Sequence, residues 1–337
     1  MSERAEGPER WREVAGPIGW IDPGPRNAIT DVPGVLVGHA QAASGQRTGV
    51  TVVVPPSLPT PAGAATVNGT GELTGRHEID ECGSIETPIH LCGTHALGTV
   101  YQAAVDASGR GPEDVVIPVV GECDDGDMAD SRTVVAADVE AALGAVGSEV
   151  AEGGAGAGTG MSCFGYPGGI GSASRVVGEH HVGVLLLCNF GDRPYLDVLG
   201  QSLGPPPSRP EPHGSCIAVC ATDAPLGPLG LRRLALRPLL GLARAGSYGS
   251  DGSGEIGVAF TTASAPAAQV DVAQTGRSMP ALGETDIDAL FAAAYEAAHE
   301  AVLNCLLAAR PAERLDGTMP EAFPIERVRE LVRARAR

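Results

Sequence analysis

The order of strand-like and helix-like segments predicts an α+β protein. Short apolar segments are interleaved with helical patterns, but strand–helix–strand units do not repeat regularly, so layered sheets and helices are favoured over a doubly wound parallel sheet. The chain has 337 residues, 43% of them hydrophobic, which is enough for one domain with a sizeable core. A long amphipathic segment near the C-terminus is the clearest single element.

Apolar and β-branched composition predicts the strands. The run 50–54 is β-branched and ends at Pro55-Pro56, and 115–120 is another short apolar run. The glycine-dense stretch 153–160 predicts a loop instead. The remaining strand candidates lie in the second half of the chain: 172–177, 182–188, 215–222 and 254–262.

Apolar periodicity predicts three helices. Residues 130–146 have helical spacing, and 225–244 begins with Pro225, a residue favoured in the first helical turn. The third helix spans 285–309, with Thr285 and Asp288 as a variant capping box, an apolar stripe along one face, and Pro311 after its end.

Two segments have the composition of irregular structure. Residues 1–26 are expected to form a loose N-terminal extension, which leaves 27–337 as a single domain. Residues 201–213 contain five prolines in thirteen positions and predict an exposed linker. A buried-strand pattern, 215–222, follows this linker directly. On composition alone, that junction could equally be a domain boundary.

Charge and basic-residue usage exclude several functions. The formal net charge of −18 argues against nucleic-acid partners and against docking on an anionic membrane. All 23 Lys and Arg positions are arginine, so a P-loop lysine, a Schiff-base lysine and a Ser-Lys dyad are absent. No segment approaches the length of a membrane-spanning helix, and the charged N-terminus does not read as a signal peptide, so a cytoplasmic enzyme is expected.

Metal, cofactor and common nucleophile motifs are also missing. The eight cysteines form no CxxC pair and lie mostly in apolar runs, which predicts reduced core residues. The eight histidines lack metal-ligand spacing, so no metal or cofactor is expected. There is no GxSxG or HExxH motif. A Ser-His triad stays possible, because its members can be far apart in sequence.

Four glycine-rich polar clusters suggest where a site would form. Each one alone is an ordinary turn, but four in one chain suggest loops that converge. The clusters are residues 68–75, 119–126, 158–161 together with 168–171, and 249–255.

The segment 213–226, His-Gly-Ser-Cys-Ile-Ala-Val-Cys-Ala-Thr-Asp-Ala-Pro-Leu, resembles the processing site of the DmpA-type L-aminopeptidase/D-esterase family, which includes β-peptidyl aminopeptidases. Residues 27–32, 47–51, 188–191 and the four clusters extend the resemblance over most of the chain. It implies a zymogen that cuts itself between Gly214 and Ser215 into subunits 1–214 and 215–337. It also implies an αββα sandwich similar to N-terminal-nucleophile hydrolases, and a homo-oligomer, a tetramer of processed protomers.

The resemblance also implies roles for individual residues. Ser215 would be the nucleophile, Ser253 and Glu255 would orient its amine, and Asn189 would be an oxyanion donor. Glu122 would anchor the free amine of a peptide, amide or ester substrate carrying an L-, D- or β-amino acid.

One position departs from the family pattern. Some relatives have tyrosine two residues after the glutamate, where this chain has Asp124. Asp125, Asp127 and Asp130 lie nearby in sequence, so we expect an acidic pocket that prefers small or basic N-terminal residues.

The chemistry of the Gly214–Ser215 junction agrees with self-cleavage that makes Ser215 an N-terminal nucleophile. A serine hydroxyl needs a base, and a free α-amine, with an ordinary pKa of roughly 7.7–8.0, can supply one on the same residue. Gly214 has no side chain, so the scissile bond can adopt a strained geometry. Two alternatives stay open: an acyltransferase resembling ornithine acetyltransferase, and an unprocessed, non-enzymatic homologue.

Overall fold

Two β-sheets form the centre of the protein. The computed structural model describes residues 9–203, 214–263 and 284–335. The smaller sheet has the strand order β1-β2-β5-β6, where the strands are Leu36–Gln41, Gly49–Val54, Ile89–Gly93 and Val119–Cys123. The larger sheet has the order β4-β3-β12-β11-β10-β9, where the strands are Ser84–Ile85, Thr60–Gly69, Gly254–Thr261, Ser215–Thr222, His180–Asn189 and Gly169–Val177. A separate two-stranded pair joins β7 (Ser162–Cys163) to β8 (Tyr166–Pro167).

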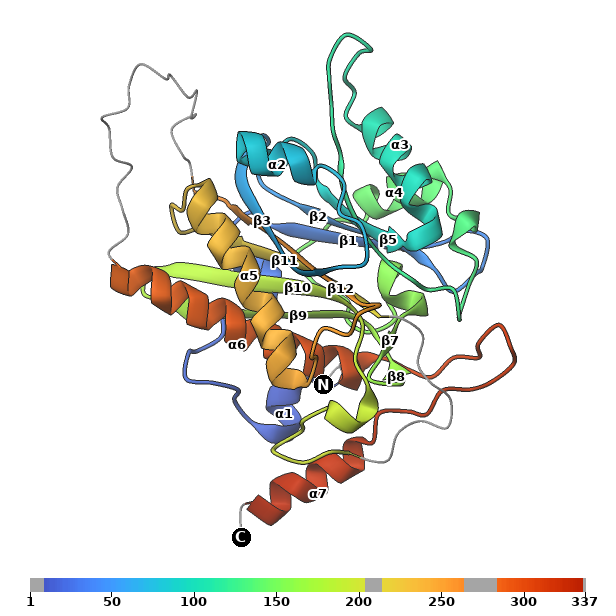
Figure 1. Ribbon diagram of the computed structural model, residues 1–337, viewed down its shortest axis with the longest axis vertical. Helices are drawn as coiled ribbons and strands as arrows, with labels where there is room; N and C mark the ends of the chain where they lie inside the picture. The colour runs from blue at the N-terminus through green and yellow to red at the C-terminus, as the bar shows by residue number, and fades with distance from the viewer. Residues whose placement is uncertain (1–8, 204–213, 264–283, 336–337) are drawn as a thin grey trace, which may run out of the picture.

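Helices cover the outer face of each sheet (Figure 1). Helices α3 (Leu97–Ala107) and α4 (Ala136–Gly144) pack on the smaller sheet, and α5 (Pro228–Ala245) and α6 (Glu284–Ala308) pack on the larger one. The result is a four-layer αββα sandwich, which confirms the fold class. The remaining helices of the described chain are α1 (Trp11–Ala15), α2 (Arg76–Cys82) and α7 (Ile325–Arg335).

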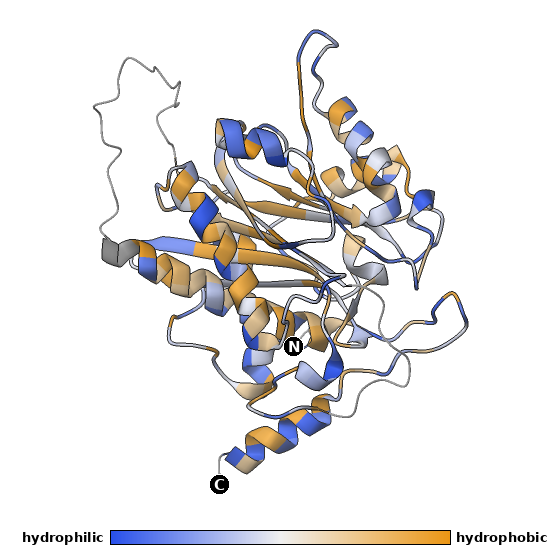
Figure 2. Ribbon diagram, viewed as in Figure 1, coloured by the Kyte–Doolittle hydropathy of each residue, from blue (hydrophilic) through white to orange (hydrophobic). Residues whose placement is uncertain are grey.

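Apolar side chains fill all three spaces between the layers. Along β11, alternate residues point to opposite faces, as the pleat of a strand requires. Ile217 and Val219 belong to the core between the sheets, whereas Cys216 and Ala218 belong to the core beneath α5 and α6. A third core lies under α3 and α4. The central strands are correspondingly hydrophobic, and α2 is mainly hydrophilic (Figure 2).

Strand β11 lies at the middle of the larger sheet. It runs antiparallel to β10 and parallel to β12, with Ser215 opposite Asn189 on one side and Gly254 on the other. The first residue of the strand is therefore held between two neighbours.

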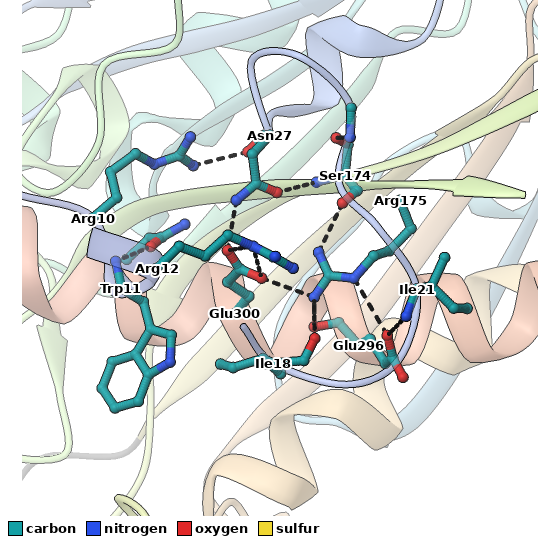
Figure 3. A network of polar contacts seen from close by, with 12 residues as sticks. Arg10, Trp11, Arg12, Ile18, Ile21, Asn27, Ser174, Arg175, Glu296 and Glu300 are labelled. Atoms are coloured by element: carbon teal, nitrogen blue, oxygen red, sulfur yellow. Dashed lines mark hydrogen bonds and ion pairs between the residues drawn. The ribbon is translucent and has the colours of Figure 1, made fainter. Parts of the chain in front are cut away.

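The N-terminal segment differs from the expected loose extension, since residues 9–26 are packed against α6. Trp11 is 2% exposed, and its backbone nitrogen donates to Asn304 Oδ1 at 2.9 Å. Arg12 Nε lies 2.8 Å from Glu300 Oε1, and Arg175 Nη2 lies 2.8 Å from Glu300 Oε2 (Figure 3). Arg12 of this segment therefore has a buried carboxylate partner, which composition could not reveal.

Most predicted elements are present with shifted ends. The strands at 50–54, 172–177, 182–188, 215–222 and 254–262 and the helix at 285–309 are all observed. The helix expected at 225–244 begins at Pro228, and 130–146 is divided into a 3-10 turn, Ser131–Thr133, and α4. The run 115–120 is not itself a strand: Val115 is exposed and β6 starts only at Val119.

Two further expectations, for a loop and for the cysteines, have definite outcomes. Part of the loop expected at 153–160 is a 3-10 helix, Gly156–Gly160. All eight cysteines are free, and seven of them are buried. The linker predicted at 201–213 lies largely outside the described residues. Within the described ranges, no helix is long and apolar enough to cross a membrane.

Candidate active site

Ser215 is a buried serine without a hydrogen-bonding partner for its hydroxyl. It is 5% exposed, and its Oγ has no partner among the described residues. The alternation along β11 places the Ser215 side chain on the same face as Ile217, toward the space between the sheets. An unpaired buried hydroxyl costs free energy, which suggests a role other than stability.

Asn189 lies next to Ser215 on the same face of the sheet. Directly opposed residues of an antiparallel pair have Cβ atoms about 4.5–5.5 Å apart. Asn189 Oδ1 accepts from Ser162 N at 2.9 Å, and Nδ2 donates to Asp124 O at 2.8 Å. These two bonds fix the orientation of the amide. An amide nitrogen carries two hydrogens, so the second remains available, because the described residues accept only one.

Ser253 and Glu255 form a buried pair on the other face of the sheet. Ser253 Oγ donates to Glu255 Oε1 at 2.5 Å, and Glu255 Oε2 has no partner within the described part of the chain. Glu255 is the parallel partner of Cys216, so it points to the face opposite the Ser215 side chain. Burial raises the pKa of Glu255, although the Ser253 hydroxyl opposes this shift. The pair therefore lies on the face of the sheet opposite the Ser215 side chain.

Glu122 is a buried carboxylate at the end of β6. Its Oε1 accepts from Glu72 N at 2.8 Å, and its Oε2 accepts from Thr94 Oγ1. Burial raises the pKa of Glu122, and these two hydrogen bonds partly offset the increase. Glu122 and Ser215 line the same cavity of about 330 Å³, together with Thr70, Thr94, His95 and Asp124.

Asp124 is an exposed residue that lines two cavities. Its Oδ1 accepts from Gly126 N at 2.9 Å, which fixes the local turn. Asp124 lines the Glu122 cavity and also a second cavity that includes Ser162, Asn189 and Arg310. Its carboxylate therefore adds negative charge at the opening of the site.

Gly214 separates the Glu122 cavity from a third cavity. It lines both, and the third cavity also includes Asn189 and Ser253. A Cβ at position 214 would lie 2.9 Å from Phe190 Cα and 3.0 Å from Asn189 O. Its φ is not in the left-handed region. Close approach to β10 therefore explains a glycine at this position.

The four glycine-rich clusters converge around Ser215. Asn68 Nδ2 donates to Ser250 O at 2.6 Å, which links the first cluster to the fourth, and Glu72 N links the first to the second through Glu122. Gly160 of the third cluster lines the same cavity as Asp124. The geometry thus brings together all seven residues singled out from the sequence, Glu122, Asp124, Asn189, Gly214, Ser215, Ser253 and Glu255.

Sequence reasoning missed three supporting residues. Thr94, Glu72 and Ser162 hold Glu122 and Asn189 in place, and two of them do so through backbone nitrogens, which leave no side-chain signature. Thr94 follows a buried strand directly, and this position was the one available signal. Across the described ranges, no group of three or more His, Cys, Asp or Glu side chains could hold a metal ion.

Comparison with known proteins identifies the family. The model of peptidase family S58 matches residues 27–319. The chain belongs to peptidase family S58. A curated relative, the β-peptidyl aminopeptidase BapA of Sphingosinicella microcystinivorans, is 37% identical over 375 aligned positions that cover 98% of this chain and 93% of the relative.

Solved structures give the same result. A β-aminopeptidase of a Burkholderia species has a TM-score of 0.82 at 38% identity, covering 94% of this chain and 96% of its own. The L-aminopeptidase D-Ala-esterase/amidase of Ochrobactrum anthropi, described as a prototype serine aminopeptidase and a variant of the Ntn hydrolase fold, has a TM-score of 0.81 at 34% identity over 97% of this chain and 99% of its own.

These similarities settle the class of the protein. It is a serine-type aminopeptidase with an Ntn-hydrolase-like fold. The resemblance to the DmpA-type family is confirmed. The family match supports a hydrolase over the two alternatives, an acyltransferase and a non-enzymatic homologue.

Proposed function

We propose that the chain cuts itself between Gly214 and Ser215, and that Ser215 then acts as the N-terminal nucleophile of the aminopeptidase. The observation that carries the proposal is the buried, unpartnered Ser215 hydroxyl at the head of β11, in one cavity with Glu122 and directly opposite Asn189. The products would be subunits 1–214 and 215–337.

The first step is an acyl shift within the intact chain. Ser215 Oγ attacks the Gly214 carbonyl carbon, the C–N bond breaks, and the Oγ proton passes to the leaving nitrogen. Gly254 N donates to Gly214 O at 3.2 Å, which polarises this carbonyl and stabilises developing negative charge on its oxygen. Water then hydrolyses the ester and leaves a Gly214 carboxylate, a free Ser215 hydroxyl and a free Ser215 amine.

The new amine supplies the base that the Ser215 hydroxyl needs in order to act as a nucleophile. Gly214 lines the Glu122 cavity and the third cavity described above, which includes Ser253 and is called the Ser253 cavity from here on. The departure of Gly214 joins these two cavities, with the amine at their junction. Ser253 and Glu255 hold the amine from the face opposite the hydroxyl. The neutral amine can then take the Oγ proton as Ser215 attacks the substrate carbonyl.

Glu122 and Asn189 supply recognition and transition-state stabilisation. The Glu122 carboxylate binds the substrate's free ammonium, so a blocked N-terminus loses a charge-assisted hydrogen bond. The remaining hydrogen on Asn189 Nδ2 stabilises the oxyanion. An acyl-enzyme forms on Ser215 as the leaving amine or alcohol departs, and water hydrolyses it.

The substrates we propose are peptides, amides or esters that begin with an L-, D- or β-amino acid. β-Residues are supported by the relatives named as β-peptidyl aminopeptidase and β-aminopeptidase. Asp124 at the opening favours small or basic first residues. A homo-oligomeric, tetrameric assembly of processed protomers in the cytoplasm is also part of this proposal, and light scattering measures the assembly.

A denaturing gel tests the central claim. Purified protein should give two bands, and the smaller fragment should begin at Ser215 in N-terminal sequencing. Ser215→Ala should give one band and no hydrolysis of alanine p-nitroanilide. A single band for the wild-type chain after long incubation would contradict the proposal, as would cleavage that persists in Ser215→Ala.

A further inference from the structure

A second cavity lies beside the proposed nucleophile and contains arginine. It shares Asn189 and Ser162 with the Ser253 cavity and Asp124 with the Glu122 cavity, and it also includes Arg310 and Arg314. The lining of this cavity also contains the Asp124 and Asp127 carboxylates, so an anionic ligand is suggested only by a guanidinium that no carboxylate already holds.

The Arg310 guanidinium is held in place by the end of helix α6. Its Nη1 donates to Leu307 O at 2.7 Å and to Ala309 O at 3.1 Å. Within the described residues, the partners of the Arg310 guanidinium are these two carbonyls and no carboxylate, and Arg310 is exposed. A guanidinium anchored by one nitrogen keeps its other donors for a planar acceptor such as a carboxylate.

The layout of the cavities assigns a direction to the substrate. With the amine at Glu122 and the scissile carbonyl near Ser215 and Asn189, the leaving group must extend beyond Asn189. Of the two cavities there, the one lined by Ser247, Tyr248 and Ser253 includes no basic side chain. The other includes Arg310. A negatively charged leaving group therefore fits the Arg310 cavity.

We propose that the Arg310 cavity binds the free C-terminal carboxylate of the leaving group, so that the enzyme prefers di- and tripeptides with a free C-terminus. The inference rests on the proposed function, because it takes Ser215 as the nucleophile and Glu122 as the amine anchor. The peptide C–N bond breaks, the acyl group passes to Ser215 Oγ, and the leaving amine gains a proton while its carboxylate stays paired with Arg310.

The test compares free acids with their C-terminal amides. The wild-type kcat/KM for β-Ala-Ala, Ala-Ala and Ala-Ala-Ala should exceed that for the corresponding amides. Arg310→Gln should reduce the acid-to-amide ratio about tenfold, consistent with loss of a charge-assisted hydrogen bond at an exposed site. The amide value should stay within about twofold, and Arg310→Lys should recover part of the ratio.

A matched variant separates this effect from net charge. Arg132→Gln removes another exposed arginine, which pairs with Asp130 outside the cavity, and should leave the acid-to-amide ratio unchanged. Equal wild-type rates on acids and amides would overturn the inference, as would an equal loss on both substrates in Arg310→Gln. Failure of the proposed function looks different: the chain stays uncut and neither substrate is hydrolysed.

Discussion

Asn189 and Ser215 face each other directly across the β10–β11 pair, on the face that points between the two sheets. Two neighbouring backbone groups, Ser162 N and Asp124 O, fix the Asn189 amide. The proposed oxyanion donor is therefore part of a strand pair and not of a loop. Such a position holds a donor in place before the reaction begins.

Asn189→Ala should reduce kcat of the cut enzyme by about 10²- to 10³-fold, the usual cost of removing one oxyanion donor. KM should change little, because the bond forms mainly in the transition state. Steady-state kinetics on alanine p-nitroanilide provide the measurement. Asn189→Asp keeps the shape but removes the donor, so it should resemble Asn189→Ala; an active Asn189→Asp enzyme would contradict the assignment.

Gly214→Ala should slow self-cleavage, because its Cβ would lie 2.9 Å from Phe190 Cα, closer than real contacts allow. The scissile carbonyl must shift away from β10, and its bond from Gly254 N at 3.2 Å then lengthens. Time courses on denaturing gels measure the rate. Gly98→Ala, in helix α3 with open space around it, is the matched control and should process normally.

Glu122→Gln should raise KM about 10- to 100-fold with a smaller change in kcat, because a charge-assisted bond to the substrate amine is lost. The raised pKa of Glu122 gives a second readout. Alaninol has an amine but no scissile carbonyl. Its inhibition should weaken as pH falls through this raised pKa, since protonation removes the carboxylate. The inhibition in Glu122→Gln should be weak and lack this dependence.

Glu300→Gln should destabilise the protein by about 3 kcal/mol, because it leaves the buried Arg175 and the partly buried Arg12 guanidinium groups without their shared carboxylate (Figure 3). Urea unfolding in a Ser215→Ala background keeps the chain in one piece. Glu326→Gln breaks an exposed pair with Arg329 and should cost about 1 kcal/mol or less. Equal effects of the two substitutions would count against the buried network.

Strong local patterns explain why part of the fold could be predicted from sequence. The strand at 215–222 is observed with those limits, because every residue in it is apolar or small and buried. Strand β3 was missed, since its residues are mostly small and have weak strand preference. Its packing explains this composition: a Cβ on Gly63 would lie 2.2 Å from Arg232 N of helix α5.

Long-range partners explain what could not be predicted. Arg12 looks like a surface residue until α6 places Glu300 beside it. The site residues themselves were found through family resemblance, whereas Arg310 carries no motif. Its place in a cavity depends on where helix α6 ends, which only the folded chain defines.

The position of β11 determines how the cut enzyme can unfold and reassemble. After the proposed cut, β11 and β12 belong to one fragment, while their neighbours β10 and β3 belong to the other. Each product then lacks part of the same sheet. Folding of the precursor is a unimolecular event, but reassembly of the cut enzyme requires two chains to meet and depends on their concentration. Maturation would therefore make unfolding effectively one-way in dilute solution, and the lifetime of the active enzyme would be set by the rate at which its sheet opens.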